Sequence, residues 1–425
     1  HEIAHAPMLI HAMRAGRTLE PKRTVVVAGH GASLVDKAAK QFDPSCDVVL
    51  QTEQLGTGHA VAQARNALDG FEGNVIVLYG DTPLIQADTL RALEACLSSA
   101  SVAVLGFDAA DPGRYGRLIA DGDQLDRIVE YKDATPQERD ITLCNSGVMA
   151  VPCRLLFDLL SSIDNNNASG EYYLTDVVAL ARKRDLLCRV VKCPEAETLG
   201  VNSRVELAQA ESEFQSRMRQ AALISGVTMP APETVHFAFD TQVANDTIVE
   251  QNVVFGPGVT VETGAKIRAF SHLEGAHVAS GCVVGPYARL RPGVTLSSDV
   301  KIGNFVEIKA SQLDAGSKVN HLSYIGDAHV GERTNIGAGT ITCNYDGVFK
   351  HKTVLGADAF IGSNTMLVAP VTVGDNAMTA SGSVITKDIP DDALALARGT
   401  QTNKPGLAKK LFSRLRAIKA AKKGS

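Results

Sequence analysis

Apolar residues return at every sixth position through most of residues 243–385. In chain order these positions are Val243, Val249, Phe255, Val261, Ile267, Leu273; Val278, Val284, Leu290, Leu296, Ile302, Ile308; Leu313, Val319, Ile325; Val330, Ile336; and Leu355, Ile361, Leu367, Val373, Ile385, with only Thr379 out of type. An α-helix repeats its apolar positions about every 3.6 residues and a flat strand every two, so neither produces this spacing. The pattern predicts a parallel β-helix, in which each side of a triangular coil points one aliphatic side chain inward.

Glycine often follows the inward residue, as in Val330-Gly331, Ile336-Gly337 and Ile361-Gly362. We expect these glycines at tight corners, where the backbone needs a conformation that a Cβ atom would penalise. The hexads stop at residues 341–354 and then resume. This interval is therefore predicted to leave the coil as a loop.

Residues 1–200 follow a different pattern, in which buried-strand runs alternate with helical stretches. The expected strands are 24–28, 47–50, 74–79 and 101–107, and the expected helices are 33–40, 58–68 and 87–97. Such an order predicts an α/β unit with a mostly parallel sheet and helices on both faces. Ligands in that architecture lie beyond the carboxyl ends of the strands, where the segments 51–60 and 79–84 would be placed.

A helical stretch is expected over residues 202–224, between the two regions, and is interpreted as their connection. Pro230 and Pro232 mark its end. Beyond Pro390 the repeat gives way to a tail in which Lys and Arg occur without acidic residues. A solvated or locally docked terminal helix is favoured there over a membrane-surface or nucleic-acid role.

Composition narrows the class of protein. The formal net charge is −5, Trp is absent and aromatic residues make up 5% of the chain, so nucleic acid is not an expected partner. The eight cysteines are scattered without a Cys-x-x-Cys pair, which favours reduced thiols and a cytoplasmic protein. No apolar run approaches the roughly 18 residues of a membrane span, and the start carries no signal-peptide pattern.

Two features of the first region suggest a phosphate site, and each has an ordinary alternative. The Gly56-Thr57-Gly58 turn offers backbone N–H groups to an anion or to the edge of a base, although such turns are common. Asp81 ends an apolar run and is suited to hold Mg²⁺ bridged to phosphates, but a helix cap is equally compatible with its position.

Polar residues gather beside the break in the repeat. They are Arg289, Arg291, Glu307, Lys309, His321, Tyr324 and Asn335. Two arginines and a lysine beside a histidine and a carboxylate indicate an anion clamp with a general base. A lone histidine on a solenoid is usually a solvated surface residue, so the prediction depends on the cluster.

Motifs along nearly the whole chain resemble the bacterial bifunctional GlmU family. They include the segments 51–60, 78–84, 115–117, 129–134, 145–147, 170–176, 200–204, 288–293, 303–309 and 321–327, and the most diagnostic is Asn-Ile-Gly-Ala-Gly-Thr-Ile-Thr-Cys-Asn-Tyr-Asp-Gly at 335–347. Their order is that of the family. The resemblance implies a Rossmann-like nucleotidyltransferase domain over 1–201, a linker helix over 202–230, a left-handed parallel β-helix over 231–398 and a basic tail over 399–425.

This family makes a precursor of bacterial cell-wall sugars by two reactions. The resemblance implies acetyl transfer from acetyl-CoA to glucosamine 1-phosphate, followed by uridyl transfer from UTP to N-acetylglucosamine 1-phosphate with release of pyrophosphate. The alternative is another sugar-phosphate nucleotidyltransferase with a β-helical oligomerisation domain, and His321 with Asn344-Tyr345 argues against it. A non-enzymatic assembly that uses the same two folds also stays open.

For acetyl transfer, the resemblance implies that His321 is the general base and that Glu307 orients its imidazole. It places Arg291, Lys309, Tyr324 and Asn335 on the sugar phosphate. It places Ala338, Asn344, Tyr345, Ser363, Ser381 and Arg398 on acetyl-CoA, with Asn344 also stabilising the oxyanion. Ser381 departs from the alanine common in relatives. The family forms homotrimers in which neighbouring subunits complete each acetyltransferase site.

For uridyl transfer, the resemblance implies that the nucleotide sugar is bound by Gln51, Gly56, Thr57, Tyr79, Gly80, Asp81, Gly116, Glu130, Asn145 and Asn202. Asp81 and Asn202 would ligate Mg²⁺. The family's opening strand and Gly-rich triphosphate loop precede the position of His1 and do not occur in this sequence. We therefore expect this chain to bind UTP poorly and to transfer uridyl groups slowly.

Overall fold

The computed structural model describes residues 1–422 and contains two compact units. The first comprises residues 1–221 with 237–240, and the second comprises 222–236 and the chain from Thr241 onwards. The stretch predicted as a linking helix forms α8 (Arg204–Ile224), whose residues up to Ala221 pack with the first unit.

The first unit is an α/β fold. Its elements are β1 (Glu2–Ile3), β2 (Ala6–Pro7), α1 (Met8–Arg17), β3 (Val25–Ala28), α2 (Ala32–Phe42), β4 (Asp47–Leu50), α3 (Thr57–Ala62), η1 (Asn66–Leu68), β5 (Asn74–Val77), α4 (Ala87–Cys96), β6 (Val102–Asp108), β7 (Arg117–Asp121), β8 (Gln124–Val129), α5 (Pro136–Arg139), β9 (Leu143–Pro152), α6 (Cys153–Leu160), α7 (Asp176–Arg182), β10 (Cys188–Lys192) and η2 (Glu195–Glu197). Each strand and helix expected before residue 108 is present within a few residues of its predicted limits, except that the helix expected over 58–68 is divided into α3 and η1.

The expectation of a mostly parallel sheet was wrong. The main sheet has the order β5-β9-β6-β10-β8-β7, and the long strand β9 runs antiparallel between β5 and β6. The strands β5, β6 and β10 do share one direction, as the alternating pattern predicts, but only β6 and β10 pair directly. β3 and β4 form a separate parallel pair. Insertion of β9, which was not identified from the sequence, therefore replaces the expected β5–β6 pairing.

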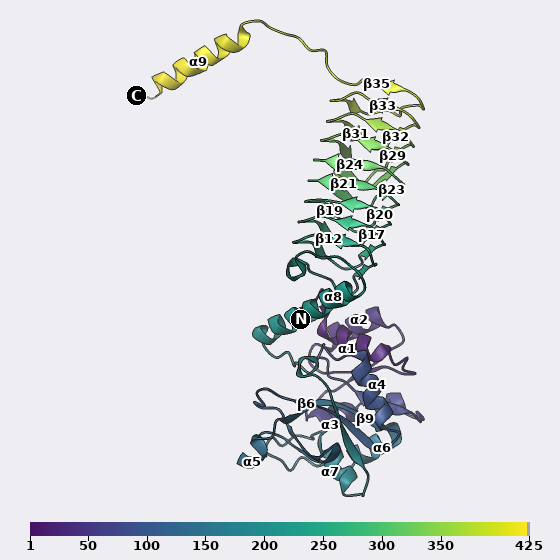
Figure 1. Ribbon diagram of the computed structural model, residues 1–425, viewed down its shortest axis with the longest axis vertical. Coiled ribbons are helices and arrows are strands. Elements are labelled where there is room, and N and C mark those ends of the chain that lie inside the picture. Colours follow the sequence, from purple (N-terminus) through teal and green to yellow (C-terminus); the bar gives the residue numbers. More distant parts are fainter. Residues whose placement is uncertain (423–425) are drawn as a thin grey trace. The chain divides into compact units, whose positions relative to one another are not determined.

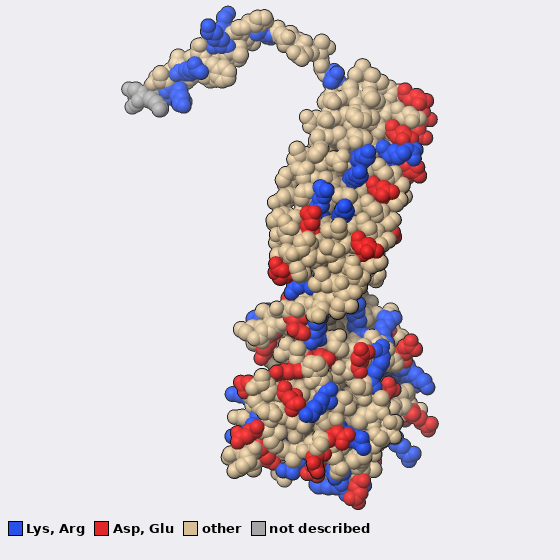
Figure 2. Space-filling view, in the orientation of Figure 1, with Lys and Arg blue, Asp and Glu red and all other residues tan. Residues whose placement is uncertain are grey.

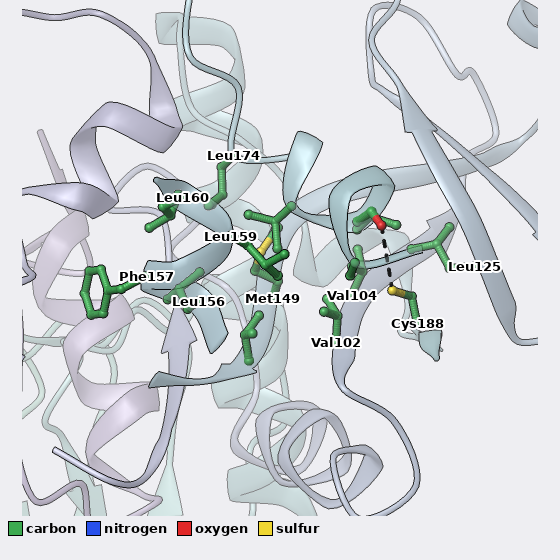
Figure 3. Packing of buried hydrophobic residues seen from close by; sticks show 14 of the residues in the cluster. Val102, Val104, Leu125, Met149, Leu156, Phe157, Leu159, Leu160, Leu174 and Cys188 are labelled. Carbon is green, nitrogen blue, oxygen red and sulfur yellow. Dashed lines mark hydrogen bonds between the residues drawn. The ribbon is translucent and has the colours of Figure 1, made fainter. Parts of the chain in front are cut away.

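Helices cover both faces of this sheet, as predicted. On one face, Val102, Val104 and Met149 pack against Leu156 of α6 and Val178 of α7. Figure 3 shows this cluster, with the thiol of Cys188 directed to the carbonyl of Val178 at 3.9 Å. On the other face, Ala103, Leu105, Val148 and Ala150 pack against Leu90 and Leu93 of α4. Side chains that alternate along the strands thus fill two apolar layers.

The second unit is a left-handed parallel β-helix of stacked coils, preceded by η3 (Pro232–Thr234) (Figure 1). The first solenoid sheet contains β11 (Gln242–Val243), β14 (Thr260–Val261), β17 (Ala276–Val278), β20 (Val294–Leu296), β23 (Gln312–Leu313), β26 (Ala328–Val330), β29 (Thr353–Leu355) and β32 (Val371–Val373). The second solenoid sheet contains β12 (Ile248–Val249), β15 (Lys266–Ile267), β18 (Val283–Val284), β21 (Lys301–Asn304), β24 (Lys318–His321), β27 (Asn335–Ile336), β30 (Phe360–Ile361), β33 (Met378–Thr379) and β35 (Leu394–Ala395). The third solenoid sheet contains β13 (Val254–Phe255), β16 (His272–Leu273), β19 (Arg289–Leu290), β22 (Glu307–Lys309), β25 (Tyr324–Gly326), β28 (Ile341–Cys343), β31 (Met366–Val368) and β34 (Val384–Ile385).

The inward residues predicted from the hexads fill the interior. All are buried except Val243 in the first coil, which is half-buried. Gln242 pairs with Thr260, eighteen residues on, whereas Thr260 pairs with His277, seventeen residues on. A coil shortened by one residue explains why the hexad phase restarts early at Val278. The polar member Thr379 is tolerated because its hydroxyl oxygen accepts a hydrogen bond from the Gly362 N–H at 2.9 Å.

The glycines after the inward residues have a different cause from the one expected. Positive φ angles at the corners fall mostly on other residues, such as Phe305 at 56° and Leu322 at 50°. A Cβ atom on Gly331 would instead lie 2.5 Å from the carbonyl carbon of Gly356, and one on Gly337 would lie 2.6 Å from the Ile361 oxygen. Close approach of the next coil therefore excludes a side chain there.

The predicted loop and tail are both present. The strand β28 stays in the coil, residues 344–352 leave it, and β29 rejoins it. The helix α9 (Leu407–Ala421) follows the last coil and has no buried residue. Lys423, a member of the predicted basic tail, lies outside the described residues. Among residues 1–422, no helix is long and apolar enough to cross a membrane. All eight cysteines are free thiols.

Candidate functional site

One corner of the β-helix brings together residues from five coils. The turn from the second to the third solenoid sheet is called here the His321 corner. Along it, Gly339 N–H donates to the His321 carbonyl at 3.2 Å, Asn364 N–H to the Ala338 carbonyl at 2.7 Å, and Gly382 N–H to the Ser363 carbonyl at 2.8 Å. The Arg398 guanidinium donates to the Ser381 carbonyl at 2.8 Å. The predicted residues His321, Ala338, Ser363, Ser381 and Arg398 therefore follow one another along a single edge.

The imidazole of His321 is exposed and held by the coil beneath it. Its Nδ1 lies 3.0 Å from Oδ1 of Asn304, the residue opposite it in the parallel pairing of β21 and β24. An amide oxygen can only accept a hydrogen bond, so Nδ1 carries the proton in the neutral ring. The other nitrogen, Nε2, is then left as a proton acceptor.

The expectation that Glu307 orients this imidazole was wrong. The coil register places Glu307 opposite Tyr324 on the third sheet, while Asn304 stands opposite His321. The Glu307 carboxylate instead forms ion pairs with Arg291 at 3.0 Å and with Arg289 at 3.6 Å. Glu307 thus orients the cations of the site.

Cations gather on the third sheet beside the corner. Lys309 forms an ion pair with Asp327 at 3.5 Å, and its neighbour Lys350 comes from the extruded loop. The hydrogen bond with Lys309 and its positive charge lower the pKa of Lys350. Arg291 also acts on Lys350 electrostatically, so that with Arg289 four cations face a pair of carboxylates, Glu307 and Asp327. This surplus of positive charge suits a phosphate.

The extruded loop folds back onto the same face. Asn344 is buried, and its amide donates to the Asp327 carboxylate and to the Tyr324 hydroxyl, the latter at 3.4 Å. Tyr345 stays exposed and donates to the Gly347 carbonyl at 2.5 Å. The loop therefore delivers Asn344 and Lys350 to the predicted cluster from outside the regular coil, while the Tyr345 side chain contacts only its own loop.

A single aspartate fastens this loop. The Asp346 carboxylate accepts hydrogen bonds from Val348 N–H at 2.8 Å and Phe349 N–H at 2.7 Å, and it pairs with His351 Nε2 at 2.7 Å. The hydrogen bond from His351 and those from the two backbone groups lower the pKa of Asp346 to about 2. The carboxylate is thus ionised at any ordinary pH.

One predicted member lies apart from the cluster. Asn335 stands opposite Lys318 on the second sheet, three residues before the position opposite His321. At about 3.3 Å per residue, that is about 10 Å along the strand. Within one chain, Asn335 therefore faces a different side of the coil from Tyr324.

A second site is built in the first unit around two loops. Gln51 is buried, and its amide donates to the Gly56 carbonyl at 3.2 Å. Gly56 has φ of 113°, and a Cβ atom there would lie 2.6 Å from the Tyr172 oxygen. Gly58 N–H donates to that oxygen at 2.8 Å, and the Leu174 N–H donates to the Thr57 hydroxyl at 3.0 Å. The segments 51–60 and 170–176, far apart in the sequence, thus form one wall.

The remaining residues of the first unit that are predicted to bind the nucleotide sugar lie close to one another. The ring of Tyr79 packs on Gly147, where a Cβ atom would lie 2.7 Å from it. Burial raises the pKa of Tyr79 to about 12, although the hydrogen bond with Thr57 opposes this. The Asn145 amide oxygen accepts from Gly147 N–H at 3.0 Å, and Asn145 N–H donates to the Gly116 carbonyl at 2.8 Å.

Glu130 completes this group. Glu130 packs closely on Gly116. A Cβ atom added to Gly116 would lie 3.4 Å from a carboxylate oxygen of Glu130. It accepts a hydrogen bond from the Thr175 hydroxyl at 3.2 Å. Burial raises the pKa of Glu130. A carboxylate of this kind is available to accept hydrogen bonds from a polar ligand.

Asp81 is not a helix cap. The helix α4 begins after Gln86, five residues further on, so the capping interpretation was wrong. Val201 N–H donates to the Asp81 carbonyl at 2.9 Å, which brings Asn202 beside Asp81. Burial raises the pKa of the Asp81 carboxyl. The pair offers hard oxygen ligands of the kind that Mg²⁺ prefers.

Comparison with known proteins identifies the family. A MobA-like NTP transferase domain matches residues 1–142, and a bacterial transferase hexapeptide domain of six repeats matches residues 352–387. The bifunctional protein GlmU of Ruegeria sp. (strain TM1040) is 65% identical over 422 residues, which cover 99% of this chain and 94% of the relative. That of Jannaschia sp. (strain CCS1) is 59% identical over 422 residues, 99% of this chain and 93% of the relative. The chain belongs to the GlmU family. It is therefore a transferase with a nucleotidyltransferase and an acyltransferase domain, as its motifs indicated.

Three residues of the cluster beside His321 were not identified from the sequence. They are Asn304, Asp327 and Lys350. The signal for Asn304 was available, because residues of adjacent coils stand seventeen or eighteen positions apart and Asn304 precedes His321 by seventeen. Lys350 had no such signal, since it belongs to the loop that leaves the repeat.

Proposed function

We propose that the chain makes UDP-N-acetylglucosamine in two steps at two separate sites. The β-helix transfers acetyl from acetyl-CoA to glucosamine 1-phosphate, and the first unit joins the product to UTP and releases pyrophosphate. The observation that carries the proposal is the free Nε2 of His321, which stands beside a cluster of cations at the end of the column Ala338, Ser363, Ser381 and Arg398.

In the first step, the amine of glucosamine 1-phosphate attacks the thioester carbonyl. His321 Nε2 accepts the proton that the amine loses, the C–S bond breaks, and CoA leaves as its thiol after taking up a proton. General-base catalysis of this kind is worth about 10²–10⁴ in rate. The Asn344 amide and the Ser363 hydroxyl are suited to stabilise the negative charge on the thioester oxygen.

The substrates are held on either side of the His321 corner. Arg291 and Lys309 bind the phosphate of the sugar, and Tyr324 contacts its ring oxygens. The donor lies along the column from Arg398 to Ala338, a span of three coil spacings or about 14 Å. Such positioning of both reactants removes much of the entropic cost before the chemistry starts.

The active enzyme is a homotrimer in this proposal. Asn335 faces a side of the coil away from the Tyr324 cluster of its own chain, so a neighbouring chain must supply it. Exposed apolar residues on the outer face of the second sheet, Phe360, Met378 and Leu394, stand in register and suit a subunit contact. Large parts of the solenoid surface seen in Figure 2 carry neither acidic nor basic side chains.

In the second step, the phosphate of N-acetylglucosamine 1-phosphate attacks the α-phosphorus of UTP, and pyrophosphate leaves. Gln51, Gly56 and Thr57 bind the uracil, while Gly116, Glu130 and Asn145 bind the amino sugar. Asp81 and Asn202 would hold Mg²⁺, which when bound neutralises phosphate charge. We place both reactions in the cytoplasm, where free thiols stay reduced.

Two assays on the purified chain test this function. Release of CoA thiol should require both acetyl-CoA and glucosamine 1-phosphate, and release of pyrophosphate should require UTP, N-acetylglucosamine 1-phosphate and Mg²⁺. A chain that binds UDP-N-acetylglucosamine but turns over neither substrate pair would be a non-enzymatic assembly. Uridyl transfer without acetyl transfer would instead favour a nucleotidyltransferase whose β-helix only oligomerises.

A further inference from the structure

The His321 corner carries a second column of side chains, one position after the first. Its members are Phe270, Tyr287, Phe305, Leu322, Gly339, Asn364 and Gly382, and each has a positive φ angle. The rings of Phe270 and Tyr287 stack with their centroids 4.8 Å apart, and those of Tyr287 and Phe305 with theirs 5.3 Å apart. This column forms an outer edge along the β-helix.

The column changes from large to small immediately beyond His321. Leu322 is the last large member, and the next coil has Gly339 at that position, followed by Asn364 and Gly382. A donor that lies along Ala338, Ser363 and Ser381 therefore runs beside small side chains. The path of the donor down the corner ends at Leu322. Phe305 holds the same position of the column one coil below Leu322.

Leu322 contributes little to the core of its own coil. The residue is 62% exposed, and its φ of 50° is one that residues with a Cβ atom rarely adopt. In two coils further along the corner, glycine occupies the equivalent position. Phe270, Tyr287 and Phe305 share this exposure and this conformation, so the feature that distinguishes Leu322 is its place: it is the large member that borders the run of small residues beside His321.

We propose that Leu322 sets the length of the acyl group that the enzyme transfers, by closing the lower end of the donor path beside His321. The inference rests on the acetyl transfer proposed above and leaves its chemistry unchanged: an amide bond forms, the thioester C–S bond breaks, and Nε2 accepts the amine proton. In this proposal the acetyl methyl group stops short of Leu322. A longer chain would continue along the corner into Leu322.

The test compares acetyl-CoA with butyryl-CoA in the full chain carrying Leu322→Gly. This variant is expected to fold, because glycine occupies the same corner position in two other coils and accepts the positive φ. Pocket contacts discriminate about 10–200-fold per methylene, so the ratio of kcat/KM for acetyl-CoA to that for butyryl-CoA should fall at least about tenfold. Thiol release with glucosamine 1-phosphate measures both rates.

Tyr287→Gly is the matched control, since it removes a large side chain from the same column two coils lower. Its acetyl-to-butyryl ratio should equal that of the unmodified chain. The inference is overturned if Leu322→Gly keeps the original ratio, or if Tyr287→Gly changes it as much. An unmodified chain that releases thiol from neither donor would refute the proposed acetyl transfer itself, which is a different result.

Discussion

His321 and Asn304 stand on adjacent coils with 3.0 Å between imidazole Nδ1 and amide Oδ1. They are seventeen residues apart in the chain and directly opposite in the parallel pairing of β21 and β24. Because the amide oxygen fixes the proton on Nδ1, the ring presents Nε2 to the substrate in the form that a general base needs. The stacking of coils therefore sets the tautomer of the proposed catalytic residue.

Removal of this hydrogen bond should slow acetyl transfer without weakening substrate binding. A hydrogen bond contributes about 0.5–1.5 kcal/mol, so Asn304→Ala should lower kcat by about tenfold while KM stays within about twofold. Asn304→Asp keeps an acceptor for Nδ1, and it should restore much of the rate and shift the pH profile. An unchanged pH profile and full activity in Asn304→Ala would contradict the positioning role.

The Asp346 fastening should control the affinity for acetyl-CoA. Asp346→Ala removes the bonds that hold residues 344–352, so KM for acetyl-CoA should rise about five- to tenfold. Val348→Ala at the exposed loop tip is the control, because it leaves those bonds in place. Equal KM values in the two variants would mean that the loop does not need this carboxylate.

The same aspartate should keep the loop folded in moderately acidic solution. Its pKa is lowered from 3.8 to about 2, so the stabilisation that it provides is fully present above 3.8 and is lost as the pH falls toward 2. Proteolysis of the loop by pepsin should therefore stay slow at about pH 4 and accelerate near pH 2. In Asp346→Ala the loop should already be cut at the higher pH.

Asp81 should be required for the metal-dependent reaction alone. A bound metal ion contributes several kcal/mol of charge stabilisation, so Asp81→Asn should lower uridyl transfer at least about a hundredfold. Acetyl transfer by the same preparation should not change, because that site belongs to the other unit. Loss of both activities would point to misfolding, and loss of neither would remove Asp81 from the metal site.

Mg²⁺ affinity at Asp81 should fall in a pH range above that of an ordinary carboxylate. Burial raises the pKa of Asp81 above 3.8, so a proton competes with the metal at higher pH than it would for an exposed aspartate. Calorimetric titration of Mg²⁺ in the presence of UDP-N-acetylglucosamine should show an affinity that begins to weaken at a higher pH than it would for an exposed aspartate, whose pKa is about 3.9. An affinity independent of pH down to about pH 4 would contradict this assignment.

The sequence predicted the architecture of the β-helix more completely than its site. Hexads are local, so inward residues such as Ile302 and Val319 followed directly from their spacing. Contacts between coils depend on whether a turn has seventeen or eighteen residues, and this register decides that Asn304 rather than Glu307 meets His321. The antiparallel strand β9 was missed for a related reason, since its position between β5 and β6 depends on partners far away in the chain.

The measurement that tests the account most directly is acetyl transfer by His321→Ala, followed as CoA thiol release with glucosamine 1-phosphate. Loss of the general base should lower kcat/KM at least about a hundredfold, while the size of the assembly and the binding of UDP-N-acetylglucosamine stay as in the unmodified chain. A His321→Ala protein with full acetyltransferase activity would contradict the mechanism.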